Sequence, residues 1–214
     1  MHFLPPALNR LIPRLCVLVA ATLFLTAPAR AEHTTEEAQA FIQNLAQTAI
    51  TTVAKGPASD AERNDRFRKL FVSAFDLPEI SRFVLARYWR TATPDQQQQF
   101  VKLFEDMQVL NWSQRFKDYQ GETLQVTAAS KEGDTGFTVD SQLARPTGNP
   151  TVVQWKMHLA ADGQIRITDI VVEGVSMALT QRSDFSSLLQ ANGGKVDELL
   201  KTLQAKVDQL RSNG

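Results

Sequence analysis

The fold is decided between residues 67 and 121, which read FRKLFVSAFDLPEISRFVLARYWRTATPDQQQQFVKLFEDMQVLNWSQRFKDYQG. This stretch holds most of the chain's phenylalanines, both tyrosines and two of the three tryptophans. Apolar side chains recur every three or four residues at Phe67, Leu70, Phe71, Ala74 and Phe75. That spacing is typical of a helix with one wide apolar face. It recurs at Ile80, Phe83, Val84 and Tyr88, and again at Phe100, Leu103, Phe104 and Met107. Bulky rings on consecutive helices either fill a core or line a cavity.

The first thirty-one residues have the pattern of a secretory signal peptide. Arg10 and Arg14 precede an apolar run, residues 15–25, which is too short to span a bilayer as a stable helix. Ala29-Arg30-Ala31 then matches a small-residue cleavage site. We therefore expect removal of residues 1–31, a mature chain that begins at Glu32, and export to the periplasm. An uncleaved membrane anchor is the alternative.

The expected mature chain, residues 32–214, has the length of a single domain. It keeps 20 basic and 23 acidic residues, a net charge of about −3, so its composition does not favour binding of nucleic acid. The only cysteine, Cys16, leaves with the signal peptide, so the hydrophobic core has to hold the domain without disulfides. We expect a monomer.

The periodicity places helices first, then strands, then helices again. We expect helices over residues 34–54 and 60–75, from 77 onward, from 95 to 116 or 119, over 177–190, and from 196 onward. Period-two alternation indicates four strands, near residues 124–128, 137–143, 153–159 and 165–173. The alternation shifts phase near Thr168-Asp169, which indicates either a bulge or burial of both faces of the strand. The predicted fold class is α+β, with a curved four-stranded antiparallel sheet and helices packed on one of its faces.

The sequence lacks the parts that common catalytic and metal sites need. The mature chain has no thiol and two histidines, and His158 alternates with polar residues of its strand, so we expect it to face solvent. There is no G-x-S-x-G elbow, no histidine pair, no cysteine cluster and no glycine-rich phosphate loop. We therefore expect no catalytic residues, no metal and no cofactor. A small hydrolase or isomerase that uses His158 or Asp169 is the competing enzyme hypothesis.

Several arginines are interleaved with the aromatic helices and have two interpretations. They are Arg82, Arg87, Arg90, Arg115 and Arg182. One interpretation is a solvated or ion-paired helix surface. The other is the rim of an apolar pocket, where a guanidinium would meet an anionic head group.

Five motifs of the chain resemble the MlaC/Ttg2D family of periplasmic phospholipid-binding proteins, also called toluene-tolerance proteins. The motifs occur in the family's order over roughly residues 67–200, and they are residues 83–94 (FVLARYWRTATP), 115–119 (RFKDY), 172–177 (VEGVSM), 180–185 (TQRSDF) and 192–194 (NGG). A relative that is encoded with hopanoid biosynthesis has similar motifs. The first and last predicted helices resemble the family only in being helices at those places, without a shared motif.

The resemblance implies a soluble shuttle that carries phospholipid between an outer-membrane lipoprotein complex and an inner-membrane ABC transporter with an MCE-domain ring. It also implies that the sheet and helices enclose a deep apolar cavity for acyl chains. From the apolar faces we predict the lining residues Phe71, Phe75, Phe83, Tyr88, Phe104, Met107, Trp155, Met157, Val172, Val175 and Met177. We predict Arg87, Arg90 and Arg182 at the head-group rim.

Two alternatives to a phospholipid carrier remain open. One is a carrier of another apolar ligand, such as a hopanoid or an aromatic solvent. The other is a structural adaptor that binds no lipid and whose aromatic faces form a solid core.

Overall fold

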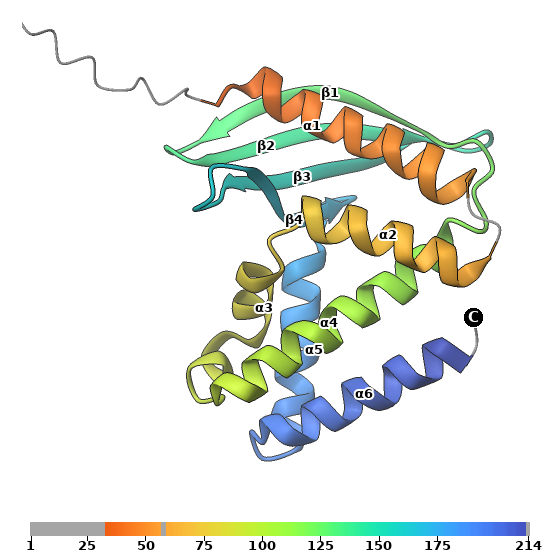
Figure 1. The fold of residues 1–214 in the computed structure, drawn as a ribbon. Coiled ribbons are helices and arrows are strands. Elements are labelled where there is room, and N and C mark those ends of the chain that lie inside the picture. Colours follow the sequence, from red (N-terminus) through yellow and green to blue (C-terminus); the bar gives the residue numbers. More distant parts are fainter. Residues whose placement is uncertain (1–32, 57–58, 213–214) are drawn as a thin grey trace, which may run out of the picture. The chain divides into compact units, whose positions relative to one another are not determined.

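A computed structural model describes residues 33–56 and 59–212 of the chain (Figure 1). The helices are α1 (Thr35–Thr48), α2 (Asp60–Ala74), α3 (Leu77–Leu85), α4 (Pro94–Arg115), α5 (Met177–Ala191) and α6 (Val196–Ser212). The strands are β1 (Thr123–Glu132), β2 (Gly136–Ala144), β3 (Thr151–Leu159), β4 (Ile165–Val172) and β5 (Val175–Ser176). A π-helical turn, Ala49–Ala54, extends α1, and a 3-10 turn, Ala86–Arg90, follows α3. The expected signal peptide, residues 1–31, lies outside the described residues.

Side-chain caps fix where the helices begin. Thr34 caps α1, and Thr93 caps α4 by accepting a hydrogen bond from the Gln96 backbone N–H. The Gln96 side chain in turn accepts from the Thr93 N–H, which completes a capping box. Asp76 Oδ1 accepts from the Glu79 N–H at 3.0 Å and so starts α3.

The sheet is an antiparallel meander in the order β1-β2-β3-β4-β5, so the predicted four strands become five. The additional strand, β5, pairs Val172 with Val175 across a two-residue turn at Glu173-Gly174, both of which have positive φ (49° and 80°). Two positive φ angles are typical of the type I′ hairpin turn. The sequence prediction missed β5 because glutamate is an uncommon first residue in that turn.

The bulge predicted in the last long strand is confirmed. Lys156 of β3 pairs with Asp169 of β4, whereas the next residue, Met157, pairs with Ile167. Thr168 is therefore an extra residue on β4. Trp155 and Met157 face α1, whereas Lys156 and His158 alternate with them and lie on the opposite face of the sheet.

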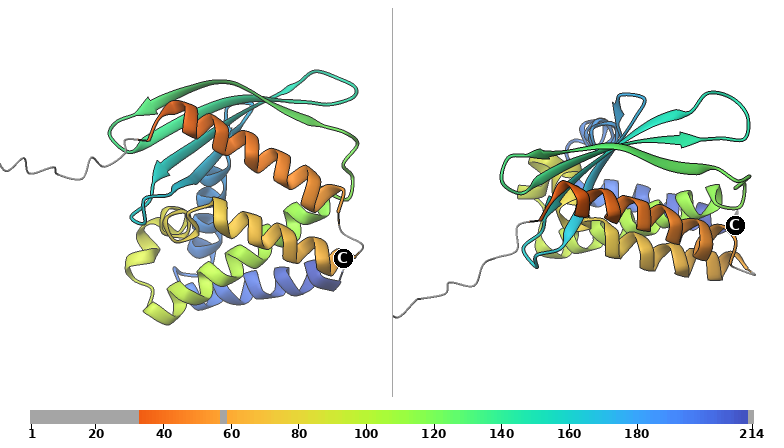
Figure 2. Two further views of the ribbon diagram at one scale, coloured as in Figure 1. Left: turned by 45° about the horizontal axis from the view of Figure 1, so that its top comes forward. Right: turned by 90° about the horizontal axis from the view of Figure 1, so that it is seen from above.

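Two separate apolar clusters form the interior of the described residues. The helical cluster is built from the inner faces of α2, α3, α4, α5 and α6. The sheet cluster lies between α1 and one face of the sheet, and Ala74 of α2 joins it. Figure 2 shows α1 running along the sheet, with α2, α4 and α6 stacked beyond it. Phe75 is half-buried and packs against both clusters, so it marks the seam between them.

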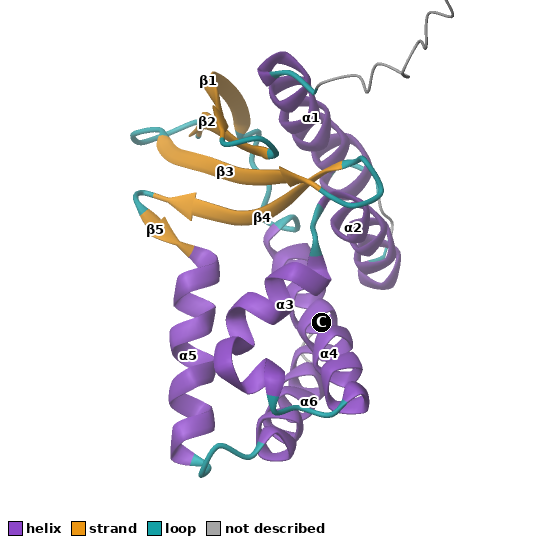
Figure 3. Cartoon of the chain, turned by 90° about the vertical axis from the view of Figure 1, so that its left-hand side faces the viewer, coloured by secondary structure: helices purple, strands orange, loops and turns teal. Residues whose placement is uncertain are grey.

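The helices therefore approach the sheet from two sides. The expectation of helices on one face holds for α1 and α2, which contribute to the sheet cluster. Residues of α3 and α5 instead lie beside Lys156 and Asp169 on the other face, near β4 (Figure 3). The enclosed apolar cavity that the resemblance implied between sheet and helices stays a prediction.

Buried charge ties three helices of the helical cluster together. Asp106 of α4 is buried and accepts hydrogen bonds from Arg68 of α2 at 2.6 Å and from Arg211 of α6 at 2.9 Å. Arg68 also pairs with Glu105. Burial lowers the pKa of the Arg68 guanidinium, but the hydrogen bonds to Glu105 and Asp106 outweigh burial and raise that pKa above its ordinary value. The arginine therefore stays charged at any pH at which the protein is folded.

Ala86 has a strained backbone at the point where α3 turns into the 3-10 segment. Its φ and ψ angles are 51° and −122°, a combination that side-chain-bearing residues rarely adopt. The turn ends α3 and sets the direction in which Arg87 and Tyr88 leave the helix. A backbone held in such a region costs about 1–3 kcal/mol.

We predict that Ala86→Gly raises the free energy of unfolding by about 1 kcal/mol. Glycine removes the backbone strain, and this gain exceeds the cost of ordering a more flexible residue on folding. Urea denaturation of the purified domain measures the change. Ala205→Gly, in the middle of α6, is the matched control and should lower stability by about 1 kcal/mol. Equal destabilisation by both substitutions would show that Ala86 is not strained.

Candidate functional site

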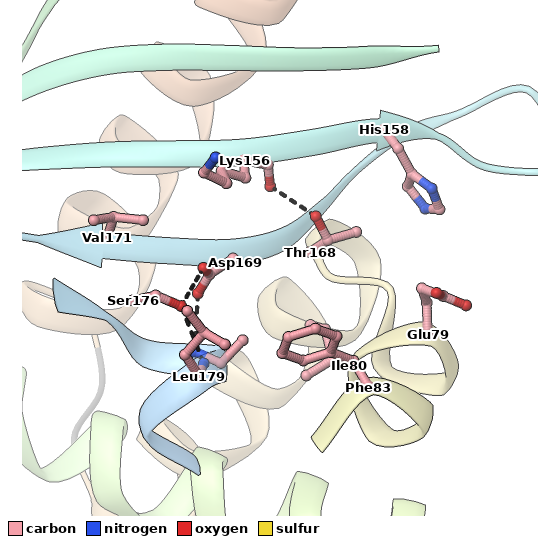
Figure 4. A pocket seen from close by; sticks show the side chains of 11 residues that line it. Glu79, Ile80, Phe83, Lys156, His158, Thr168, Asp169, Val171, Ser176 and Leu179 are labelled. Carbon is pink, nitrogen blue, oxygen red and sulfur yellow. Dashed lines mark hydrogen bonds between the residues drawn. The ribbon is translucent and has the colours of Figure 1, made fainter. Parts of the chain in front are cut away.

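A cleft of about 480 Å³ opens between α3, the start of α5 and the face of β3 and β4 that points away from α1 (Figure 4). We call it the α3–α5 cleft. Its apolar walls are Ile80, Phe83, Val171, Ala178 and Leu179. Its polar residues are Glu79, Lys156, His158, Thr168, Asp169 and Ser176. The exposed rings and chains of Phe83 and Leu179 give it an apolar rim.

Asp169 fixes the corner of the cleft where the sheet passes into α5. Its carboxylate accepts hydrogen bonds from the Ser176 hydroxyl at 2.5 Å and from the Ala178 N–H at 2.9 Å. Ser176 in turn caps α5 by accepting from the Leu179 N–H at 3.0 Å. Figure 4 shows this group at one end of the cleft, with Glu79 and His158 at the other.

The alternation in β3 predicted that His158 faces solvent, and this prediction is wrong. His158 is half-buried, and its Nε2 lies 2.7 Å from Asp76 Oδ2. The two residues are far apart in sequence, so strand periodicity gave no sign of the contact. The pair links β3 to the residue that starts α3.

The His158–Asp76 pair lacks the nucleophile that the hydrolase hypothesis needs. Two hydroxyls line the cleft, those of Thr168 and Ser176. The Thr168 hydroxyl donates to the Lys156 carbonyl at 3.3 Å, and the Ser176 hydroxyl donates to Asp169. Neither is directed at His158, so the geometry of a Ser-His-Asp triad is not formed by these groups.

A second pocket, of about 250 Å³, lies further along α3 and α5. It is lined by Ala86, Arg87, Arg182, Ser186 and Gln190, and we call it the arginine pocket. The Arg182 guanidinium lies over the Phe83 ring at 5.1 Å, and that of Arg87 lies over the Tyr88 ring at 4.9 Å. The structure thus brings together two of the three arginines predicted at the head-group rim. The third, Arg90, is exposed and lines neither pocket.

The residues predicted to line a lipid cavity are distributed over several places rather than gathered in one. Phe83 lines the α3–α5 cleft. Phe71, Phe104 and Met107 are buried in the helical cluster, against which Tyr88 packs. Met157 is buried in the sheet cluster, where Trp155 is half-buried and donates from Nε1 to the Ser141 hydroxyl at 2.9 Å. Phe75 lies at the seam.

The remaining three predicted lining residues belong to the corner between β4 and α5. Val172 pairs with Val153 and Val175, and Met177 is half-buried at the start of α5. Val175 is 53% exposed, because it lies on the short edge strand β5. Sequence reasoning missed Ile80, Val171, Ala178 and Leu179, although the apolar stripe of α3 included Ile80. On the polar side of the cleft, sequence reasoning named His158 and Asp169 only for the enzyme hypothesis and did not place either beside a cavity.

Comparison with known proteins decides the family. The model of the family described as "MlaC protein" matches residues 32–205. The chain belongs to the MlaC family. It is 21% identical over 137 residues to the toluene tolerance protein ttg2D of Pseudomonas putida, covering 64% of this chain and 63% of the relative. It is 22% identical over 129 residues to the intermembrane phospholipid transport system binding protein MlaC of Haemophilus influenzae, covering 59% of each. The matched region thus spans less than two thirds of these MlaC relatives.

A solved structure has the same fold. It is a phospholipid-binding protein from Ralstonia solanacearum in complex with a phospholipid, and it matches with a TM-score of 0.72 at 21% identity. The match covers 81% of this chain and 98% of the other. This likeness shows that the two chains share the α+β arrangement described above. Within the described part of this chain, none of the helices has the length and apolar character needed to cross a membrane.

We predict a measurable coupling between Asp76 and His158 in folding stability. Asp76→Asn keeps the cap on the Glu79 N–H but removes the charge that meets His158. In a double-mutant cycle with His158→Gln, the coupling energy should be roughly 0.5–1 kcal/mol, since both side chains are partly exposed. Urea denaturation of the four proteins provides the cycle. Strict additivity would mean that the contact adds nothing to stability.

Proposed function

We propose that this chain is a periplasmic carrier that binds a phospholipid and moves it between outer- and inner-membrane complexes. The observation that carries the proposal is the family match over residues 32–205, most of the chain. The names of two relatives, one a phospholipid transport binding protein and one a phospholipid-binding protein solved with its ligand, support lipid as the cargo. Catalysis has no part in the proposal.

The arrangement of the apolar clusters offers a place for acyl chains. A domain of this size usually has one contiguous core, whereas here two clusters meet through Phe75. Separating them at this seam breaks few polar contacts, among them the Asp76–His158 pair and the Asp76 N–H to Ile167 C=O hydrogen bond. We place the chains in the seam, between Phe71 and Phe75 on the helical side and Trp155 and Met157 on the sheet side. The α3–α5 cleft, on the other face of β3 and β4, then serves as the mouth, which the chains reach past the edge of β4 where Asp76 contacts Ile167.

The energetics of lipid in water explain why a carrier is needed. The two acyl chains of a phospholipid contain roughly 30 methylenes, and exposing them to water costs on the order of 25 kcal/mol. Unassisted diffusion across an aqueous compartment is therefore negligible. A carrier has to bury both chains and leave the polar head group outside, which requires apolar side chains and a mobile mouth.

The partners and the location belong to the same proposal. We place the mature protein in the periplasm after removal of residues 1–31. Its proposed partners are an inner-membrane ABC transporter with an MCE-domain ring and an outer-membrane lipoprotein complex. Both come from the resemblance to the family and from the name of the relative in the intermembrane transport system.

The first test is native mass spectrometry of the protein expressed from Glu32, with lipid extraction alongside. We expect a bound species whose mass matches a two-chain phospholipid and whose extract contains phosphorus. A bound lipid without phosphorus would show that the ligand is another apolar molecule, such as a hopanoid, and not a phospholipid. Protein that carries no lipid and takes up none from labelled vesicles would favour the structural adaptor.

A variant at the seam tests where the chains lie. Phe75→Asp puts a carboxylate between the two clusters, so we expect at least a tenfold loss of co-purified phospholipid, because a charge beside acyl chains is poorly solvated. Val72→Asp, on the exposed face of α2 just before Phe75, is the matched control and should bind normally. Phosphorus content and circular dichroism measure binding and folding. Normal phospholipid binding by a folded Phe75→Asp variant would show that the acyl chains do not lie in the seam.

A further inference from the structure

The arginine pocket is built by one turn of chain and one face of a helix. Arg182, Ser186 and Gln190 recur every four residues and so form a single stripe on α5. The strained turn at Ala86 brings Arg87 opposite that stripe. Because α3 and α5 pack side by side, as Figure 3 shows, the two guanidinium groups share one pocket although their residues are distant in sequence.

Neither guanidinium has a carboxylate partner within residues 33–56 and 59–212. Arg63, Arg66, Arg68, Arg166 and Arg211 each form an ion pair closer than 3 Å. The residues that line the arginine pocket include no aspartate or glutamate. Arg87 and Arg182 are instead oriented by rings, and Arg87 Nη2 donates to Tyr88 Oη at 2.8 Å. Stacking on a ring fixes the plane of a guanidinium and leaves most of its N–H groups to donate elsewhere.

The arginine pocket adjoins the apolar α3–α5 cleft. Phe83 lines that cleft and carries the Arg182 guanidinium on its ring. Leu179, another wall of the cleft, precedes Arg182 by three residues on α5 and so lies one turn away. An apolar chain in the cleft would therefore have its polar end beside the two arginines.

We propose that the arginine pocket binds the phosphodiester of a lipid head group and selects lipids whose head group has a net negative charge. This inference rests on the proposed phospholipid-carrier function. Two guanidinium groups, the Ser186 hydroxyl and the Gln190 amide all donate hydrogen bonds, which suits phosphate oxygens. Two positive charges against one phosphate leave the pocket positive, so a head-group ammonium is repelled. No carboxylate of the pocket compensates for that repulsion.

The test is competition between two lipids with identical acyl chains. Delipidated protein is mixed with vesicles that contain equal amounts of phosphatidylglycerol, which has a net charge of −1, and zwitterionic phosphatidylethanolamine, and the bound ratio is read by native mass spectrometry. We expect about a tenfold preference for phosphatidylglycerol at low salt, which falls as ionic strength rises. Equal binding of both lipids would overturn the selectivity while leaving the carrier function intact. Binding of neither lipid would overturn both.

Variants test whether the lipid preference comes from the arginine pocket or from charge elsewhere on the surface. The double variant Arg87→Gln and Arg182→Gln should bind less phosphatidylglycerol, so that the bound ratio of the two lipids falls to about one. The double variant Arg87→Lys and Arg182→Lys should keep most of the preference, because it keeps the charge. Arg82→Gln is the control, since Arg82 is an exposed arginine of α3 outside both pockets. A preference that survives the glutamine double variant would contradict the proposal.

A last arm distinguishes a lipid phosphate from a free anion. Inorganic phosphate is titrated calorimetrically into the delipidated protein and into the glutamine double variant. We expect no binding below millimolar concentration, because the apolar cleft supplies most of the affinity for a lipid. Micromolar binding that requires the two arginines would assign the pocket to free phosphate and overturn the head-group assignment.

Discussion

The two apolar clusters are joined through the short link between α2 and α3, and much of the remaining structure depends on that link. Phe75 packs its ring into both clusters. The Asp76 N–H donates to the Ile167 carbonyl of β4 at 3.0 Å, while its carboxylate starts α3 and contacts His158. Two neighbouring residues thus set the position of the helices relative to the sheet. They also place the α3–α5 cleft, because α3 begins at this link.

The helical cluster is held differently from the seam. Asp106 is buried with two arginine partners on two other helices. Separating α2, α4 and α6 would take these partners away from a buried carboxylate, so the three helices resist separation. The seam is crossed by a partly exposed histidine–aspartate contact, by the hydrogen bond from the Asp76 N–H to the Ile167 carbonyl and by apolar packing at Phe75. A movement that admits a ligand is therefore easier at the seam than within the helical cluster.

The sequence predicted the features that depend on neighbours in the chain. The bulge at Thr168 and the helix–sheet–helix order follow from local propensity and period. The fifth strand was missed because its turn uses an atypical residue, Glu173. The His158–Asp76 contact and the convergence of Arg87 on Arg182 join distant segments, which no periodicity encodes.

The candidate site was predictable only in part, because it too depends on packing between segments that are distant in sequence. Apolar periodicity identifies which side chains leave water, but a core residue and a cavity-lining residue have the same pattern. Phe104 and Met107 are thus buried in the helical cluster, whereas Phe83 lines an open cleft, although all three lie on similar stripes. What separates them is the packing of α5 against α3, which is set by the sheet-to-helix corner at Asp169.

For the proposed carrier, the seam also bears on release. The gain of roughly 25 kcal/mol from burying two chains applies relative to water, and it exceeds the strongest non-covalent affinities, about 18–21 kcal/mol. A bilayer buries the same chains equally well, so exchange between membrane and carrier is nearly neutral in apolar transfer. The free energy of separating the clusters at Phe75 then opposes loading, and their closure favours release. A docking partner that holds the seam open would lower the barrier in both directions, which leaves the direction of transport to the membranes and complexes rather than to this chain.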